Sequence, residues 1–199
     1  MKSICGRTVL SIVAVALSFS PLAAHALTEL SRVGANGDAG AKSECPAGQQ
    51  LVGFSGRSGV WIDRIQIVCA APQANNRMTS PAAVGGEFGG TGGGRSDGFC
   101  SKDSAMTAMF IALTKNDRQI AAITMECVSK VSGERFQVTF GNTSYVKHCG
   151  GGIGVGDCSV SLNTNQRCPA NEVPIGINVR YGKDVNGLGM ICGQVAGRR

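Results

Sequence analysis

The chain has 199 residues, of which 43% are hydrophobic and 16% charged, and it contains 29 glycines and nine cysteines. This length suits one domain with a hydrophobic core. The formal net charge at pH 7 is +6, but the basic residues are scattered along the sequence, so nucleic acid is not expected as a partner.

Residues 1–26 have the three parts of a secretory signal peptide. Two cations lie within Met1–Arg7, residues 8–22 are mostly apolar and uncharged, and Ala24-His25-Ala26 has the small-x-small form that signal peptidase cleaves. The apolar run is too short to span a membrane, and no other stretch is long enough, so we expect no membrane span. The mature chain, 27–199, is therefore predicted to be secreted or periplasmic; the alternative is an N-terminal membrane anchor.

Cleavage would remove Cys5 and leave an even number of cysteines. An even count in an exported chain predicts a disulfide framework. A zinc site is the rival interpretation, but the sequence has no C-x-x-C motif and the mature chain has one histidine, His148. We therefore expect no metal and no cofactor. The remaining cysteines are Cys45, Cys69, Cys100, Cys127, Cys149, Cys158, Cys168 and Cys192.

Three of the cysteine intervals form an internal repeat. The segments 45–69 and 168–192 both open with Cys-Pro-Ala and align without a gap, which places Arg57 on Arg180 and Gly59 on Gly182. The segment 100–127 is a looser middle copy. Because related units should close in related ways, the repeat selects one pairing of the cysteines. The predicted disulfides are Cys45–Cys69, Cys100–Cys127 and Cys168–Cys192, with Cys149–Cys158 closing a glycine-rich loop.

Each repeat ends in a strand with alternating apolar residues, which places one row of side chains on a single buried face. Glycine-rich turns precede two of these strands, and no stretch keeps a helical period for three turns. The sequence therefore predicts an all-β domain of three pseudo-repeated antiparallel sheets around a shared core. The three rows are Ile65, Ile67 and Cys69; Ile123, Met125 and Cys127; and Leu188, Met190 and Cys192.

The segment 51–63 resembles the closing strands of jacalin-type lectins. In that family an apolar strand and a glycine-containing turn lead into a G-x-x-x-D loop, and 59–63 has this form, with Trp61 two residues before Asp63. The family's G-G-x-G-G run is similar to 89–93, although here the loop precedes the run, the order of a circularly permuted domain. The Cys-bounded repeats also resemble the vitelline membrane outer layer protein family. Both resemblances imply a β-prism fold.

The lectin resemblance implies one sugar site. A carboxylate accepts hydrogen bonds from hydroxyls, glycines let the backbone approach closely, and an aromatic face covers the apolar side of a sugar. The middle copy has Ala121 where the first has Asp63, and the third has Asn186, so whether the third copy carries a second site stays open. The predicted site comprises Gly59, Trp61, Asp63, Gly89, Gly90, Gly92 and Gly93.

Each part of the predicted site also has a purely structural interpretation: Asp63 caps its turn, Trp61 is a core residue, and the glycine run is a connector.

Catalysis has little support, because the cysteines are committed to disulfides and His148 lies beside one of them. A glycosidase needs two neighbouring carboxylates, but nothing in the sequence spacing of the aspartates favours such a pair. The candidates are Asp63, Asp97, Asp103 and Asp184. We therefore predict a secreted carbohydrate-binding, lectin-like protein that is not an enzyme and whose partner is a glycan or glycoconjugate. The alternative is a structural or protein-binding module, such as a surface coat or an inhibitor of a secreted enzyme.

Overall fold

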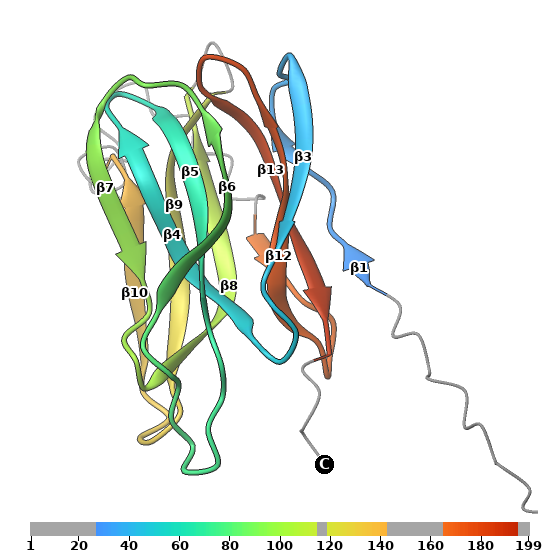
Figure 1. Ribbon diagram of the computed structural model, residues 1–199, viewed down its shortest axis with the longest axis vertical. Coiled ribbons are helices and arrows are strands. Elements are labelled where there is room, and N and C mark those ends of the chain that lie inside the picture. The colour runs from blue at the N-terminus through green and yellow to red at the C-terminus, as the bar shows by residue number, and fades with distance from the viewer. Residues whose placement is uncertain (1–26, 115–118, 143–164, 195–199) are drawn as a thin grey trace, which may run out of the picture.

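The computed structural model describes residues 27–114, 119–142 and 165–194, and all its regular elements are β-strands arranged in three antiparallel sheets (Figure 1). The described part of the chain contains no helix, and hence none that could cross a membrane. The all-β prediction with three sheets is therefore confirmed. We call the sheets first, second and third after the repeat that each contains.

Each repeat forms the central hairpin of one sheet. The first sheet has the order β6-β5-β4-β7 and the second the order β10-β9-β8-β11. The third has the order β1-β13-β12-β3, with β2 also paired to β13. The strands are β1 (Thr28–Glu29), β2 (Val33–Gly34), β3 (Ala39–Glu44), β4 (Gln50–Ser58), β5 (Ile62–Ala70), β6 (Ala82–Gly89), β7 (Gly94–Phe99), β8 (Ser104–Leu113), β9 (Ile120–Ser129), β10 (Arg135–Gly141), β11 (Asn165–Arg167), β12 (Val173–Tyr181) and β13 (Val185–Gly193).

The core lies where the three hairpins face one another. All nine side chains of the predicted apolar rows on β5, β9 and β13 are at most 1% exposed. Phe54 of β4 and Phe140 of β10 join them, with ring centroids 5.9 Å apart. Because successive strand residues point to opposite faces, the alternating residues of both strands of a hairpin turn their side chains toward this interior.

Three disulfides connect the start of each central hairpin to its closing strand, as predicted. Their Cα–Cα distances are 5.8 Å for Cys45–Cys69, 5.6 Å for Cys100–Cys127 and 5.6 Å for Cys168–Cys192. Each bridge closes a loop of 24 to 27 residues, which restricts the unfolded chain and stabilises the fold by roughly 3 kcal/mol in the chain-entropy account. The predicted Cys149–Cys158 bridge lies outside the described residues.

The third sheet joins the two ends of the described chain. Thr28 of β1 pairs with Cys192 of β13, and Val33 of β2 pairs with Leu188. Beyond these strands the chain continues into β3, which pairs with β12 on the other side of the hairpin. The third repeat is thus completed by N-terminal residues, whereas the first repeat is completed by β6 and β7, which follow it directly.

Candidate functional site

The candidate site lies at the end of the molecule where three strand connections meet, at the top of Figure 1. These are the β4–β5 turn, the β6–β7 connection and the tip of the β12–β13 hairpin. The Phe88 and Tyr181 rings are in contact, with centroids 5.4 Å apart, and a side chain on Gly90 would overlap the backbone of Lys183. The third repeat therefore forms one border of a site built on the first.

Asp63 is the centre of this site. It is the second residue of β5, and only 8% of its surface is exposed. The carboxylate lies so close to the backbone of Gly92 and Gly93 that a Cβ on either residue would overlap its oxygens, and a Cβ on Gly59 would lie 3.7 Å from Oδ2. The fold thus gathers three of the predicted glycines around the carboxylate of Asp63, and glycine is the residue that permits such an approach.

The other three predicted residues lie around this centre. Gly89 has a positive φ of +117°, and a side chain there would overlap the Asp63 carbonyl oxygen, which accepts a hydrogen bond of 2.8 Å from the Gly90 N–H. Trp61 is half-buried and is not one of the core residues, and its carbonyl accepts a hydrogen bond of 2.9 Å from the Gly59 N–H. The structure thus disfavours the core interpretation of Trp61.

Two arginines outside the predicted set hold the glycine run in place. Arg57 donates from Nε to the Gly92 carbonyl at 2.7 Å and from Nη2 to the Gly93 carbonyl at 2.6 Å. Arg64 donates from Nε to the Gly90 carbonyl at 2.7 Å. The run is therefore anchored by charge-assisted hydrogen bonds and is more than a connector. These contacts join residues 26 to 36 positions apart in the sequence, so no local pattern pointed to either arginine.

The electrostatic environment disfavours the ionised form of Asp63. Burial, and secondly the nearby Asp184 carboxylate, raise the pKa of Asp63, while the Gly59 N–H, its own N–H and Arg57 partly oppose that change. Oδ2 is buried and has no hydrogen-bond partner among the described residues. A buried acceptor without a donor costs free energy, so the carboxylate has hydrogen-bonding capacity that the described residues leave unused.

The three sheets repeat the backbone of this site. Gly34, Gly89 and Gly141 all have positive φ angles, +109°, +117° and +99°, and approach the carbonyls of Asn186, Asp63 and Ala121 respectively. The residue after each glycine donates its N–H to the same carbonyl, at 2.8, 2.8 and 3.0 Å. The third sheet takes its glycine from before the hairpin and the first from after it. Because both orders occur within one chain, a glycine run that follows its G-x-x-x-D loop does not require a circular permutation of the domain.

The side chains differ between the copies. Ala121 offers no polar side chain, so the position that matches Asp63 carries no carboxylate in the middle copy. In the third copy a Cβ on Gly37 would lie 2.9 Å from Asn186 Oδ1, and a Cβ on Gly182 would lie 2.5 Å from Asp38 Oδ2. An amide thus takes the place of Asp63 there, and the acidic group comes from a different strand connection.

The remaining candidates for chemistry do not gather at the site. Asp97 accepts a hydrogen bond from Ser55, which together with Arg95 lowers its pKa, and Asp103 is ion-paired with Arg77 at 3.7 Å. His148 lies outside the described residues. Within the described ranges no three His, Cys, Asp or Glu side chains are placed to hold a metal ion.

Comparison with known proteins identifies the fold. No protein-family model matches the chain, and no curated protein matches it by sequence. Among solved structures, a mannose-binding lectin from champedak matches 85% of this chain and 98% of its own, with 11% identity and a TM-score of 0.50. Malaysian banana lectin (15% identity, 84% and 98% covered, TM-score 0.49) and single-chain recombinant jacalin (14%, 87% and 97%, TM-score 0.49) are similar to it as well.

The chain therefore has the jacalin-like β-prism fold that the sequence resemblance implied. This is a fold shared with lectins, and at such identities the likeness defines the fold alone. The three disulfides add that the fold is suited to an oxidising compartment.

Proposed function

We propose that this protein is a secreted or periplasmic lectin that binds a glycan at Asp63. The observation that carries the proposal is the buried carboxylate oxygen without a partner, enclosed by glycines at one end of the β-prism. Folding alone gives no reason to keep an ionisable group in a place that disfavours its charge, whereas binding sites commonly do so.

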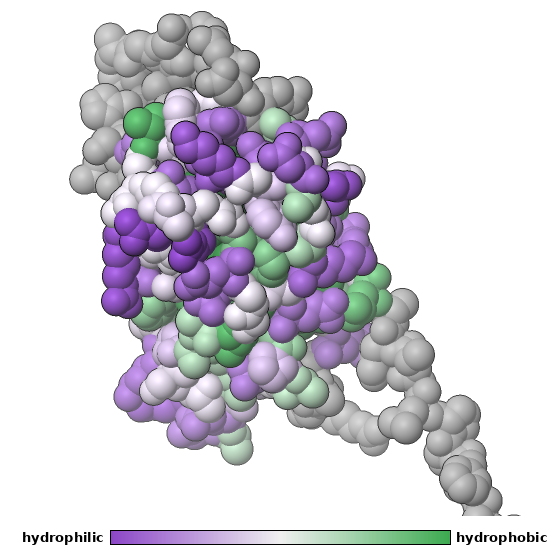
Figure 2. All heavy atoms as spheres, turned by 45° about the horizontal axis from the view of Figure 1, so that its top comes forward, coloured by the Kyte–Doolittle hydropathy of each residue, from purple (hydrophilic) through white to green (hydrophobic). Residues whose placement is uncertain are grey.

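The chemistry of this site matches a sugar. Vicinal hydroxyls of a glycan donate to the Asp63 carboxylate, and the half-buried Trp61 covers an apolar C–H face of the ring. Gly92 and Gly93 are exposed on their outer side, so a ligand approaches the carboxylate across the glycine run. On the face that Figure 2 presents, hydrophilic side chains predominate, which suits a polar ligand better than an apolar partner.

Mannose is the first sugar to test, because the champedak lectin is described as mannose-binding. The experiment is a glycan array on the mature, oxidised protein, with Asp63→Ala and Asn186→Ala beside the wild type. We expect Asp63→Ala to lose binding by more than about tenfold, the effect of losing one or two hydrogen bonds to a charged group. Asn186→Ala is the matched substitution in the third copy and should bind as the wild type does.

Two results would overturn the proposal. A wild-type protein that binds no glycan would favour the structural or protein-binding alternative. Equal losses in Asp63→Ala and Asn186→Ala would show that the first copy has no special role.

A further inference from the structure

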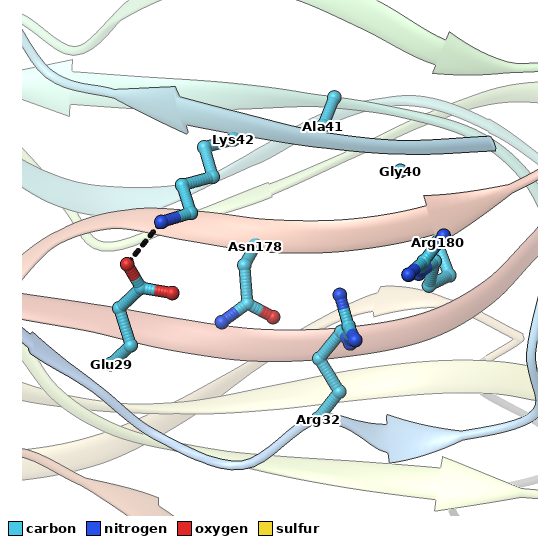
Figure 3. Close-up of a pocket in the computed structure, with 7 residues that line it drawn as sticks. All are labelled: Glu29, Arg32, Gly40, Ala41, Lys42, Asn178 and Arg180. Atoms are coloured by element: carbon cyan, nitrogen blue, oxygen red, sulfur yellow. Dashed lines mark hydrogen bonds and ion pairs between the residues drawn. The ribbon is translucent and has the colours of Figure 1, made fainter.

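The outer face of the third sheet carries an open groove of about 400 Å³, away from the Asp63 carboxylate (Figure 3). Strand register explains its lining. Asn178 and Arg180 of β12 lie opposite Lys42 and Gly40 of β3, and their partners on the other side, on β13, are glycines. Glu29 and Arg32 from the N-terminal segment complete the rim. Because the β13 partners and Gly40 lack side chains, the polar groups of β12 line a hollow.

The groove has an excess of positive charge. Arg32, Lys42 and Arg180 line it together with one carboxylate, Glu29, which is ion-paired with Lys42. Glu44, the next outward-facing residue of β3, lies over Gly176 beyond Lys42. Neither Arg32 nor Arg180 forms an ion pair with a carboxylate of the described residues. Two guanidinium groups are therefore available to an anion, and their planar fork suits a carboxylate or sulfate.

Two buried polar atoms in the groove have no hydrogen-bond partner within the part of the chain that the structure describes. Asn178 is only 6% exposed; its Nδ2 donates to the Leu30 carbonyl at 3.4 Å, while Oδ1 receives no hydrogen bond. Nε of Arg180 is also buried without an acceptor. Gly40 leaves room for this guanidinium, because a Cβ there would lie 3.1 Å from its central carbon. The groove thus lacks both an acceptor beside Arg180 and a donor beside Asn178.

We propose that this groove is a second binding site, specific for an acidic saccharide. A sugar carboxylate accepts hydrogen bonds from Arg180 and Arg32, whose side chain points between Asn178 and Arg180 in Figure 3. A neighbouring sugar hydroxyl donates to Asn178 Oδ1. A simple inorganic anion would satisfy only the arginines, so the unpartnered amide is the observation that favours a saccharide. This site does not depend on lectin activity at Asp63.

The test is an NMR titration of the mature, oxidised protein with methyl glucuronide, methyl glucoside and sulfate. We expect the glucuronide to shift the backbone signals of Arg32, Asn178 and Arg180, and the neutral glucoside to leave them unchanged. Arg180→Gln and the exposed Arg32→Gln should each weaken glucuronide binding by roughly tenfold, the loss of one charge-assisted contact. Arg135→Gln, which removes the same charge from the second sheet, is the control and should bind normally.

Asn178→Ala should remove the preference for glucuronide over sulfate, and its melting temperature shows whether the variant is folded. Equal binding of sulfate and glucuronide by the wild type would overturn the assignment to a saccharide. Signals in the groove that do not move, or an equal loss in Arg135→Gln, would overturn the site itself.

Discussion

At the scale of single residues, the Asp63 carboxylate lowers the stability of the free protein and keeps an unused hydrogen-bond acceptor. Burial and Asp184 raise its pKa above the ordinary value, and one oxygen has no partner. With a folded-state pKa above the unfolded one, its contribution to stability is present at low pH and is lost as pH rises through the folded pKa. At neutral pH the ionised side chain therefore destabilises the free protein.

Asp63→Asn tests this account of stability. Removing the buried charge should leave the free energy of unfolding at pH 7 at least as high as that of the wild type, as measured by denaturant titration. If Asp63 is only a turn cap, its replacement by alanine should instead lower stability by about 1 kcal/mol without affecting glycan binding.

Glycan affinity should depend on pH in the opposite direction to stability. Sugar hydroxyls donate to the ionised carboxylate, so binding favours deprotonation and lowers the raised pKa of Asp63. Affinity is therefore expected to be weak at acidic pH and to strengthen as pH rises through the pKa of the free protein. Calorimetric titrations across this range measure the effect, and Asp63→Asn should lose it. Affinity that increases on acidification would be incompatible with this mechanism.

At the scale of strands, much of the fold could be predicted because it depends on local periodicity. The apolar rows of β5, β9 and β13 and the three described disulfides follow from alternation and from the repeat. The anchoring role of Arg57 and Arg64 could not be predicted, because it depends on where β6 returns across the sheet. The same holds for Gly34 and Gly141, whose conformation is imposed by a carbonyl on a neighbouring strand.

A pair of glycine substitutions tests this backbone arrangement. Gly89→Ala should destabilise the fold by more than about 1 kcal/mol, since alanine is strained at a φ of +117° and would meet the Asp63 carbonyl. Gly94→Ala, where no atom lies within 4 Å of a Cβ and φ is not positive, should change stability little. Thermal melts of both variants measure the difference in stability. Equal melting temperatures would refute the close approach of Gly89 to the Asp63 carbonyl.

At the scale of the whole molecule, the β-prism brings together residues that are far apart in the sequence. Asp184 and Lys183 of the third repeat border a site whose carboxylate belongs to the first. No pattern within one repeat could predict this contact, because it depends on how the sheets pack around the core. Conversely, Asp97 and Asp103 do not meet as a catalytic pair, because Asp97 accepts a hydrogen bond from Ser55 and Asp103 forms an ion pair with Arg77.

The proposed signal peptide can be tested on exported material. Cleavage before Leu27 would place the new N-terminus next to β1, where Thr28 pairs with Cys192. N-terminal sequencing of the mature protein should begin with Leu27. A membrane-bound product that retains residues 1–26 would support the anchor alternative.

Glycan binding at Asp63 is tested most directly by a carboxyl-carbon NMR titration of this residue with and without the glycan selected on the array. In the free protein we expect a pKa above the ordinary aspartate value, and in the glycan complex a lower one, because hydroxyl donors stabilise the charged form. An Asp63 pKa that saturating glycan leaves unchanged would contradict the proposal that this carboxylate binds the sugar.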